Sequence, residues 1–165
     1  MKNLKVWQLI VGLVLVVGGS VLFIVGVSGG FGIEKAVLDA EYVCEDGCEF
    51  SYTELTPEEY EKLVAEKKSF VVMIDQGGCV TAERLREEYV RDFAISKKIK
   101  VYKMMFADLK KTSLYDFVKY YPSVVVVSKG KPIGWLRADS DEDADAYNKY
   151  EAFEGWIEKY LNIPE

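Results

Sequence analysis

The spacing of apolar residues changes several times along this 165-residue chain, and the longest apolar run comes first. Residues 6–27 form 22 positions without a charged side chain. A helix rises about 1.5 Å per residue, so a run of this length spans roughly 30 Å of hydrocarbon. Lys2 and Lys5 precede the run, and every acidic residue follows it. The positive-inside rule then predicts a cytoplasmic stub over residues 1–5, a signal anchor crossing the cell membrane once over 6–27, and an outward domain.

A cleaved signal peptide is the alternative for the same run. Signal peptides have apolar cores of about 7–15 residues followed by an A-x-A-like site. The core here is longer, and 26-GVSGG-30 is a poor cleavage site, which favours an uncleaved anchor. Small side chains at Gly12, Gly18, Gly19 and Ser20 would let two such helices approach closely, so a dimer through the transmembrane helix is a further hypothesis.

After the apolar run, residues 28–40 are expected to form a linker, and residues 41–165 the domain outside the membrane. The domain begins with 41-EYVCEDGCEFSY-52, in which aromatic and β-branched arms flank Asp46-Gly47. Asp-Gly between such arms is a turn signal, so this stretch predicts a hairpin or a strand–turn segment.

The rest of the domain alternates between helical and strand spacing. Thr56, Pro57 and Glu59 have the spacing of a capping box with proline at the first helical position, which predicts a helix over 56–68. Residues 69–75 are a continuous apolar run, typical of a strand buried on both faces. The elements predicted after it are a helix from Cys79, a strand over 99–108, a short helix over 112–121, a strand–turn–strand segment over 124–138 and an amphipathic helix over 144–161.

This order of elements predicts an α/β fold of three layers, α/β/α, around a mixed sheet. Strand–helix–strand crossovers imply parallel pairing in the first half of the domain. The Lys-Gly turn inside 124–138 implies antiparallel pairing in the second half. Helices on both faces of such a sheet bury enough apolar surface for one stable domain of about 125 residues.

Composition excludes several kinds of site. The chain has no histidine, which excludes Ser-His and Cys-His catalysis and histidine metal ligands. Its formal net charge is −6, and after residue 5 there are 19 basic against 27 acidic side chains. An acidic domain without a basic stripe argues against nucleic acid as a partner. No nicotinamide or flavin site is visible, so no cofactor is expected.

The acidic stretch 139-DSDEDAD-145 has aspartate at alternate positions, like the start of a calcium loop. Such a loop needs glycine at its sixth position and glutamate at its twelfth, where this chain has Ala144 and Tyr150. A solvated loop before a helix N-terminus explains the stretch better, so no metal is expected.

Three features resemble the thioredoxin family. The strand 70-FVVMID-75 leads into Cys79, which opens a long helix. The strand 101-VYKMMFAD-108 ends in aspartate and precedes a short helix. The stretch 121-YPSVVVVSKGKPIG-134 looks like the family's cis-proline strand followed by its glycine turn and last strand. The resemblance covers roughly residues 53–163 and implies a thioredoxin fold.

The sequence departs from the family's pattern at the redox site. Gly78 stands where the family has a tryptophan, Ala82 replaces the second cysteine, and Met73 replaces the buried aspartate that assists proton transfer. Cys79 remains at the nucleophile position and Pro122 at the cis-proline position. Conventional dithiol reduction is therefore not expected.

The resemblance implies a binding site around Cys79. Gly78 and the stretch Tyr121-Pro122-Ser123 are expected to lie against this cysteine and to offer backbone groups to an extended peptide. A helix N-terminus favours the thiolate, so Cys79 is predicted to form mixed disulfides with thiols of extracytoplasmic polypeptides. The alternative is an inert, half-buried cysteine in a non-enzymatic binding or scaffold module.

Cys44 and Cys48 flank the predicted turn. The outward side of a membrane is usually oxidising, and a tight turn brings two Cα atoms within the roughly 4.4–6.8 Å that a disulfide needs. A Cys44–Cys48 disulfide is therefore expected, either structural or exchangeable. A sharper hypothesis is that this pair resolves a mixed disulfide on Cys79. A zinc site is not expected from two cysteines without histidine.

Overall fold

The computed structural model describes residues 34–44 and 49–163. Helices and strands alternate along most of this range, as the spacing of apolar residues predicts. In chain order the described elements are β1 (Ala36–Val37), η1 (Ala40–Tyr42), β2 (Thr53–Glu54), α2 (Pro57–Ala65), β3 (Phe70–Asp75), α3 (Val80–Arg84), η2 (Leu85–Val90), α4 (Arg91–Ser96), β4 (Tyr102–Met105), α5 (Phe106–Leu109), η3 (Ser113–Asp116), β5 (Ser123–Ser128), β6 (Lys131–Trp135), η4 (Asp141–Tyr147), α6 (Tyr150–Ile157) and β7 (Leu161–Asn162).

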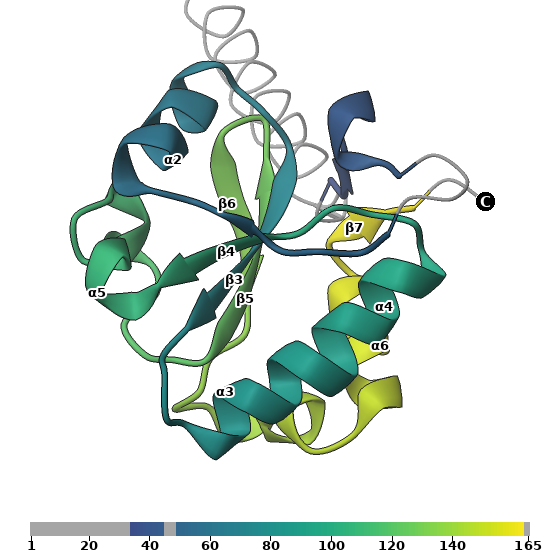
Figure 1. The fold of residues 1–165 in the computed structure, drawn as a ribbon. Coiled ribbons are helices and arrows are strands. Elements are labelled where there is room, and N and C mark those ends of the chain that lie inside the picture. The colour runs from purple at the N-terminus through teal and green to yellow at the C-terminus, as the bar shows by residue number, and fades with distance from the viewer. Residues whose placement is uncertain (1–33, 45–48, 164–165) are drawn as a thin grey trace, which may run out of the picture. The chain divides into compact units, whose positions relative to one another are not determined.

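Among these residues the main sheet has five strands, in the order β2-β4-β3-β5-β6 (Figure 1). β4 pairs in parallel with both β2 and β3, whereas β5 is antiparallel to both β3 and β6. The central strand β3 is buried at all 6 of its residues, as its continuous apolar run predicts. The predicted mixed sheet, parallel in its first half and antiparallel in its second, is confirmed.

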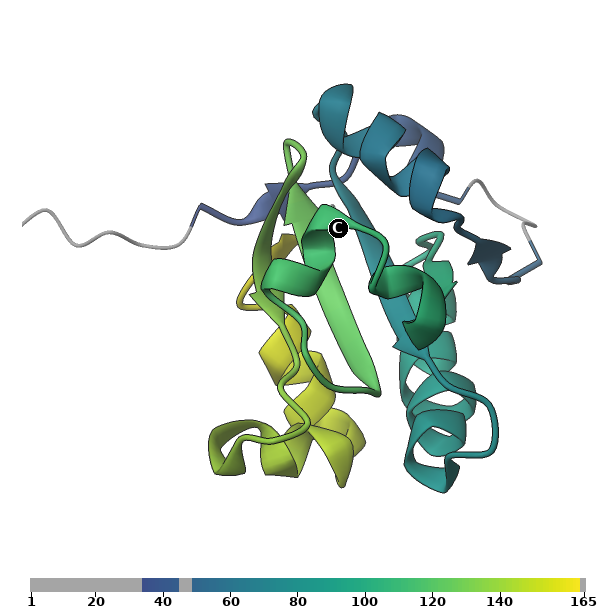
Figure 2. The same ribbon diagram turned by 90° about the vertical axis from the view of Figure 1, so that its left-hand side faces the viewer.

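Helices cover the sheet on both faces (Figures 1 and 2). α2 and α5 lie on one side, and the run from α3 to α4 lies with α6 on the other. On this second side the rings of Phe93 and Phe153 pack edge to face, with centroids 5.9 Å apart. Both rings are fully buried, and such aromatic pairs contribute about 0.5–1.5 kcal/mol beyond their buried area. The predicted three-layer α/β/α architecture is thus confirmed.

α2 begins with the predicted capping box. The backbone N–H of Glu59 donates to the Thr56 hydroxyl at 3.3 Å, and the N–H of Thr56 donates to the Glu59 carboxylate at 3.0 Å. Pro57 occupies the first turn, where its missing N–H costs nothing. α2 ends at Ala65, and Lys67 takes a left-handed conformation, with φ at 57°, in the turn that leads to β3. The helix therefore ends earlier than the predicted residue 68.

The predicted turn between β5 and β6 is formed by Lys129 and Gly130. Their φ values are 51° and 76°, as in the two-residue turns that favour hairpins. At Gly130 a side chain would also collide with the carbonyl of Val64 at the end of α2. Glycine is therefore required here by both its conformation and its neighbour.

Cys79 precedes one continuous helical run. α3 is followed by the π-helical stretch η2 and then by α4. The buried residues Leu85, Tyr89 and Phe93 lie on the inner side of this run, at the spacing that predicted the helix. Stretches of π-helix are rare and often occur near functional sites.

The second half of the domain contains shorter helices than the sequence predicts. The expected helix over 112–121 is only a 3-10 turn, Ser113–Asp116. The expected helix over 144–161 begins at Tyr150, and a 3-10 stretch takes its first part. Arg137 explains this difference, because its backbone N–H and guanidinium both donate to Asp143 and hold the acidic stretch against the end of β6.

The described residues of the stretch 41–52 do not form a hairpin. Val43 forms an isolated antiparallel bridge with Ile99, outside the stretch. Residues 49–52 form no strand, and the edge strand β2 begins only at Thr53, beside β4. The prediction of a hairpin is therefore wrong for the described arms. The turn residues 45–48 lie outside the described residues.

Two short strands have no signal in the local sequence. Ala36 and Val37 form β1, which pairs in parallel with β7 at Leu161 and Asn162. Ala36 and Leu38 are buried. The expected linker over 28–40 therefore includes a packed strand, which the short, unpatterned sequence around it did not reveal.

The expected stub over residues 1–5, the anchor over 6–27 and the first part of the linker lie outside the described residues. Within residues 34–44 and 49–163, no helix has the length and apolar character that crossing a membrane requires. The anchor stays a prediction.

Candidate functional site

The loop after β3 presents Cys79 at the start of the helical run. Asp75, the last residue of β3, is buried, and its carboxylate accepts from the N–H of Gln76 at 2.7 Å and pairs with Arg86. Gly78 has a φ of 78°, a conformation in which a side chain is strained. Cys79 follows as the N-cap residue, and its carbonyl accepts from the N–H of Glu83 at 2.9 Å. The cysteine is a free thiol and is half-buried.

The segment before β5 brings a cis-proline to the same place. The peptide bond between Tyr121 and Pro122 is cis, as the resemblance implies. The Pro122 carbonyl accepts a hydrogen bond from the Tyr147 hydroxyl at 2.7 Å. Burial raises the pKa of Tyr147, which keeps the hydroxyl protonated and able to donate. Tyr147 therefore fixes the cis-proline segment from the side of α6.

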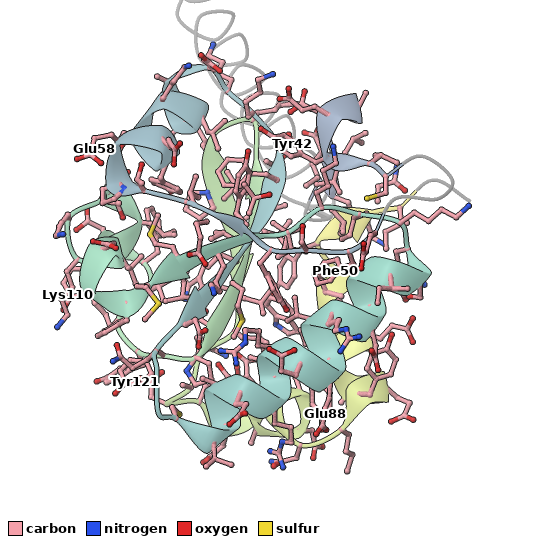
Figure 3. The ribbon with its side chains drawn as sticks, viewed as in Figure 1. Tyr42, Phe50, Glu58, Glu88, Lys110 and Tyr121 are labelled. Carbon is pink, nitrogen blue, oxygen red and sulfur yellow. The ribbon has the colours of Figure 1, made fainter. Side chains whose placement is uncertain are left out.

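Cys79, Tyr121 and Pro122 line one groove with a volume of about 500 Å³. The opposite wall comes from residues 138–148, which connect β6 to α6. Figure 3 shows Tyr121 at the end of the molecule where β3 leads into α3, with Tyr42 at the opposite end. Three segments that are distant in sequence thus meet around one thiol.

Arg84 fixes α3 to the opposite wall of the groove. Its guanidinium donates to the carbonyl of Tyr147 at 2.7 Å and to the side-chain oxygen of Asn148 at 3.2 Å. Arg86, the other arginine near Cys79 in sequence, is instead paired with Asp75 and Glu87. Only Arg84 therefore adds its positive charge to the groove that holds the thiol.

The remaining predicted site residues lie beside or beneath the groove. Gly78 is exposed and precedes the thiol without lining the groove. Ser123 is fully buried, and its hydroxyl donates to the carbonyl of Leu136 at 2.7 Å. Ser123 therefore joins β5 to the end of β6 under the groove, and its side chain is not available to a ligand.

The positions that replace the family's second cysteine and aspartate are both in the core. Ala82 and Met73 each have 0% exposure. Neither supplies a thiol or a carboxylate next to Cys79. A disulfide formed on Cys79 has no thiol at position 82 to resolve it.

Cys44 is too far from Cys79 to resolve a mixed disulfide on it. The N–H of Cys44 donates to the carbonyl of Lys98 at 2.6 Å, just beyond the C-terminal end of α4, whereas Cys79 lies before α3. The helical run from Val80 to Ser96 between these two points rises about 25 Å. A disulfide needs Cα atoms within about 7 Å. Cys44 itself is therefore not placed to resolve such a disulfide. Cys48 lies outside the described residues, so the hypothesis of resolution by the pair and the Cys44–Cys48 disulfide both stay predictions.

Two residues of the groove have no signal in the sequence. Tyr147 falls in the stretch predicted as an amphipathic helix, yet its hydroxyl donates to the carbonyl of Pro122. Arg84 follows Cys79 by five residues, yet its guanidinium donates to the distant Tyr147 and Asn148. Both contacts join residues more than 20 positions apart, and no short motif indicates them.

The acidic stretch 139–145 is engaged mainly in ion pairs with basic side chains. Arg137 pairs with Glu142 at 2.6 Å and Asp143 at 3.1 Å, and Lys149 pairs with Asp145 at 3.3 Å. Among residues 34–44 and 49–163, no group of three acidic or cysteine side chains is placed to hold a metal ion.

The strand order, the helix that starts at Cys79 and the cis bond before Pro122 agree with what the resemblance implies. The described domain has a thioredoxin-like fold. No protein-family model and no curated protein matches the sequence.

Solved structures that are similar include three thioredoxins. A thioredoxin preprotein from Schistosoma mansoni is 16% identical, with 66% of this chain and 96% of that chain covered and a TM-score of 0.49. A mutant thioredoxin from Halobacterium salinarum is 18% identical, with 72% and 100% covered and a TM-score of 0.47. A thioredoxin from Plasmodium falciparum is 16% identical, with 66% and 99% covered and a TM-score of 0.47. These similarities concern the backbone fold and not the chemistry of Cys79.

Proposed function

We propose that this protein is a membrane-anchored thioredoxin-like protein that handles thiols and disulfides of extracytoplasmic polypeptides through the single thiol of Cys79. The observation that carries the proposal is that Cys79 and cis-Pro122 line the same groove. The apolar run over residues 6–27, preceded by lysines, supports the anchor and the outward orientation of the domain.

The chemistry is thiol–disulfide exchange. The Cys79 thiolate attacks one sulfur of a substrate disulfide, a new bond joins Cys79 to that sulfur, and the other sulfur leaves as a thiolate. A second, external thiolate then attacks the substrate sulfur of this mixed disulfide and releases Cys79. Each step exchanges one sulfur–sulfur bond for another, so no electrons are gained or lost overall.

Turnover therefore depends on a thiol from outside the domain. Ala82 has no thiol, and Cys44 lies at the other end of the helical run. This arrangement favours a long-lived mixed disulfide, which suits capture or protection of a substrate cysteine better than repeated reduction. The external thiol would come from a small thiol or from another protein.

A non-enzymatic binding module is the second candidate. It is favoured by the loss of both the second cysteine and the proton-transferring carboxylate, because Ala82 and Met73 are packed as ordinary core residues. In this case the groove binds a polypeptide, and Cys79 is only one of its walls.

Thiol capture by the full-length protein in mild detergent separates the two candidates. The folded protein is first reduced and then treated with glutathione disulfide, and adducts are counted and located by mass spectrometry. We expect one rapid adduct on Cys79, which Cys79→Ser abolishes. If Cys79 reacts only after denaturation, the single-thiol function is wrong and the binding module remains.

A second experiment tests the anchor and the orientation. Intact cells that produce the protein are treated with a membrane-impermeant maleimide, which we expect to label Cys79. Labelling that requires lysis, or recovery of the protein in the soluble fraction of the cells, would contradict the outward, anchored arrangement.

A further inference from the structure

A second hollow continues the Cys79 groove towards β6. It has a volume of about 230 Å³ and shares Ala138 and Asp139 with the groove around Cys79. The segment that ends at Pro122 forms one wall of both hollows, and the segment that follows Trp135 forms the other. The N–H of Leu136 donates to the carbonyl of Val124 at 3.0 Å, which joins the walls beneath. The two hollows form one trough.

The far end of this trough is lined by exposed aromatic side chains. Tyr120 is 54% exposed and Phe117 is 45% exposed. The Phe117 ring packs edge to face on Trp135, with centroids 5.6 Å apart. Large aromatic side chains that stay open to water beside a hollow are typical of surfaces that bind an apolar group.

One wall of the trough carries two open carboxylates. Asp139 lines both hollows and Asp141 lines the one around Cys79, and neither forms an ion pair with another described residue. At the far end, Arg137 binds its neighbouring carboxylates. In the groove around Cys79, the two open carboxylates outnumber the one basic side chain, Arg84, which donates to neutral oxygens.

The trough also offers a backbone unit for pairing. Within the described part of the chain, no hydrogen bond engages the backbone N–H or carbonyl of Tyr121. This residue lies between the thiol at one end and the aromatic hollow at the other. An extended polypeptide gains affinity from such backbone groups and specificity from pockets for its side chains.

We propose that the trough binds an extended polypeptide segment that carries a basic side chain opposite Asp139 and Asp141 and an aromatic side chain between Tyr120 and Trp135. This inference builds on the proposed function and adds the substrate class: basic, aromatic segments close to a cysteine. The aromatic hollow supplies buried apolar area, and the two carboxylates supply charge complementarity that speeds association and selects against acidic segments.

The test compares short fluorescent peptides that contain serine in place of cysteine. One probe has lysine and tryptophan flanking the serine, a second has glutamate in place of lysine, and a third has alanine in place of tryptophan. Binding to the full-length Cys79→Ser protein in detergent is followed by fluorescence anisotropy at low and high salt. We expect the first probe to bind about tenfold tighter than either of the others, with the charge preference falling at high salt.

Substitutions in the trough test which side chains set the preference for lysine and for tryptophan in the peptide. Asp139→Asn with Asp141→Asn should remove the preference for lysine, and Tyr120→Ala should remove the preference for tryptophan. Asp92→Asn and Ile95→Ala, at exposed positions of α4 outside the trough, are the matched controls and should change neither. Equal affinities for the three probes, or equal losses in the controls, would overturn the inference.

Failure of the proposed peptide preference can be distinguished from failure of the proposed thiol function. Thiol capture by Cys79 is measured with glutathione disulfide, which has neither a lysine nor a tryptophan. If Cys79 captures glutathione but the three peptides bind equally, the single-thiol function stands and the proposed substrate class is refuted. If the peptides bind with the expected preference but Cys79 captures no glutathione, the substrate class stands and the thiol chemistry is refuted.

Discussion

The two ends of the helical run from α3 to α4 each lie next to a cysteine, and they differ in what surrounds it. At the α3 end, Cys79 is a free thiol in a groove, beside a cis-proline and an exposed aromatic surface. At the α4 end, the backbone of Cys44 is hydrogen-bonded to Lys98, and its neighbour Val43 bridges to Ile99. At one end the cysteine lines a groove, whereas at the other the segment that holds the cysteine is hydrogen-bonded to the residues that follow α4.

The two ends differ in which backbone N–H and carbonyl groups are already hydrogen-bonded within the domain. At the α3 end, a helix begins, and no hydrogen bond from another described residue engages the backbone of Tyr121, which precedes cis-Pro122. At the α4 end, short strands use up the backbone groups: Val43 pairs with Ile99, and β1 pairs with β7. The same residue type therefore lies in an open groove at one end and in a hydrogen-bonded segment at the other.

The largest expected effect comes from Ala82→Cys, which restores a second thiol one helical turn after Cys79. A tethered thiol has an effective concentration in the mM range or above, so release of a mixed disulfide should be at least ~10-fold faster than with about 0.1 mM external thiol. Mass spectrometry of the glutathione adduct over time measures this. Ala82→Ser is the matched control, and an unchanged adduct lifetime in Ala82→Cys would show that position 82 does not face the thiol.

The α4 end is probed by Leu161→Ala in β7. Leu161 is 2% exposed, and truncating a buried leucine costs about 2–4 kcal/mol in the free energy of unfolding. Urea unfolding measures this loss. Glutathione capture by the folded variant should stay as fast as in the wild type, and Ile95→Ala, at 50% exposure, should cost less than about 0.5 kcal/mol. Slower capture by Leu161→Ala would mean that the two ends are coupled.

A smaller effect is expected from Tyr147→Phe, which removes the hydrogen bond to Pro122. Leaving that carbonyl without its donor should cost about 1–2 kcal/mol of unfolding free energy near neutral pH. The raised pKa of Tyr147 means that the folded state prefers the protonated phenol. Its contribution is therefore full below the unfolded pKa of about 10 and falls as pH rises above it.

The pH dependence of the Tyr147 contribution is measured as the free energy of unfolding from pH 7 to 11. Above about pH 10, Tyr147→Phe should lose less stability than the wild type. Capture by Cys79 should also slow in Tyr147→Phe, since the cis-proline wall loses its support. If stability and capture both match the wild type, Tyr147 does not position Pro122.

The smallest effect is expected from Lys97→Met at the α4 end. Lys97 pairs with Glu158 at 2.9 Å and Glu154 at 3.2 Å, and partly exposed pairs contribute about 0.5 kcal/mol. The Lys97 ammonium donates hydrogen bonds to the carboxylates of Glu158 and Glu154, and these raise the pKa of Lys97, the bond to Glu158 most. The contribution is therefore full below the unfolded pKa of about 10.4 and is lost as pH rises through the folded value. Thermal unfolding at low and at high salt measures this loss. Lys97→Met should melt at a lower temperature than the wild type only at low salt.

Much of the fold was predictable because its signals are local. The capping box of Thr56, Pro57 and Glu59, the apolar run of β3 and the turn at Lys129-Gly130 each form as the sequence predicts. The stretch 41–52 does not form the predicted hairpin, and its residue Val43 instead bridges to the distant Ile99. A single bridge of this kind has no repeating apolar pattern, so the local sequence does not indicate it.

Residue identities alone establish which groups the site lacks. Histidine is absent, Ala82 stands in place of the family's second cysteine and Met73 in place of its buried aspartate. These conclusions need only residue identities at positions that a family pattern marks.

The surroundings of the Cys79 thiol, in contrast, depend on how distant elements pack together. Tyr147 and Arg84 close the groove through hydrogen bonds that span many residues, and Ser123 turns out to lie under it. The separation of Cys44 from Cys79 also depends on where the chain returns after the helical run. Sequence spacing encodes which face of an element is apolar, but the pairing of distant polar groups is set by how the packed elements meet.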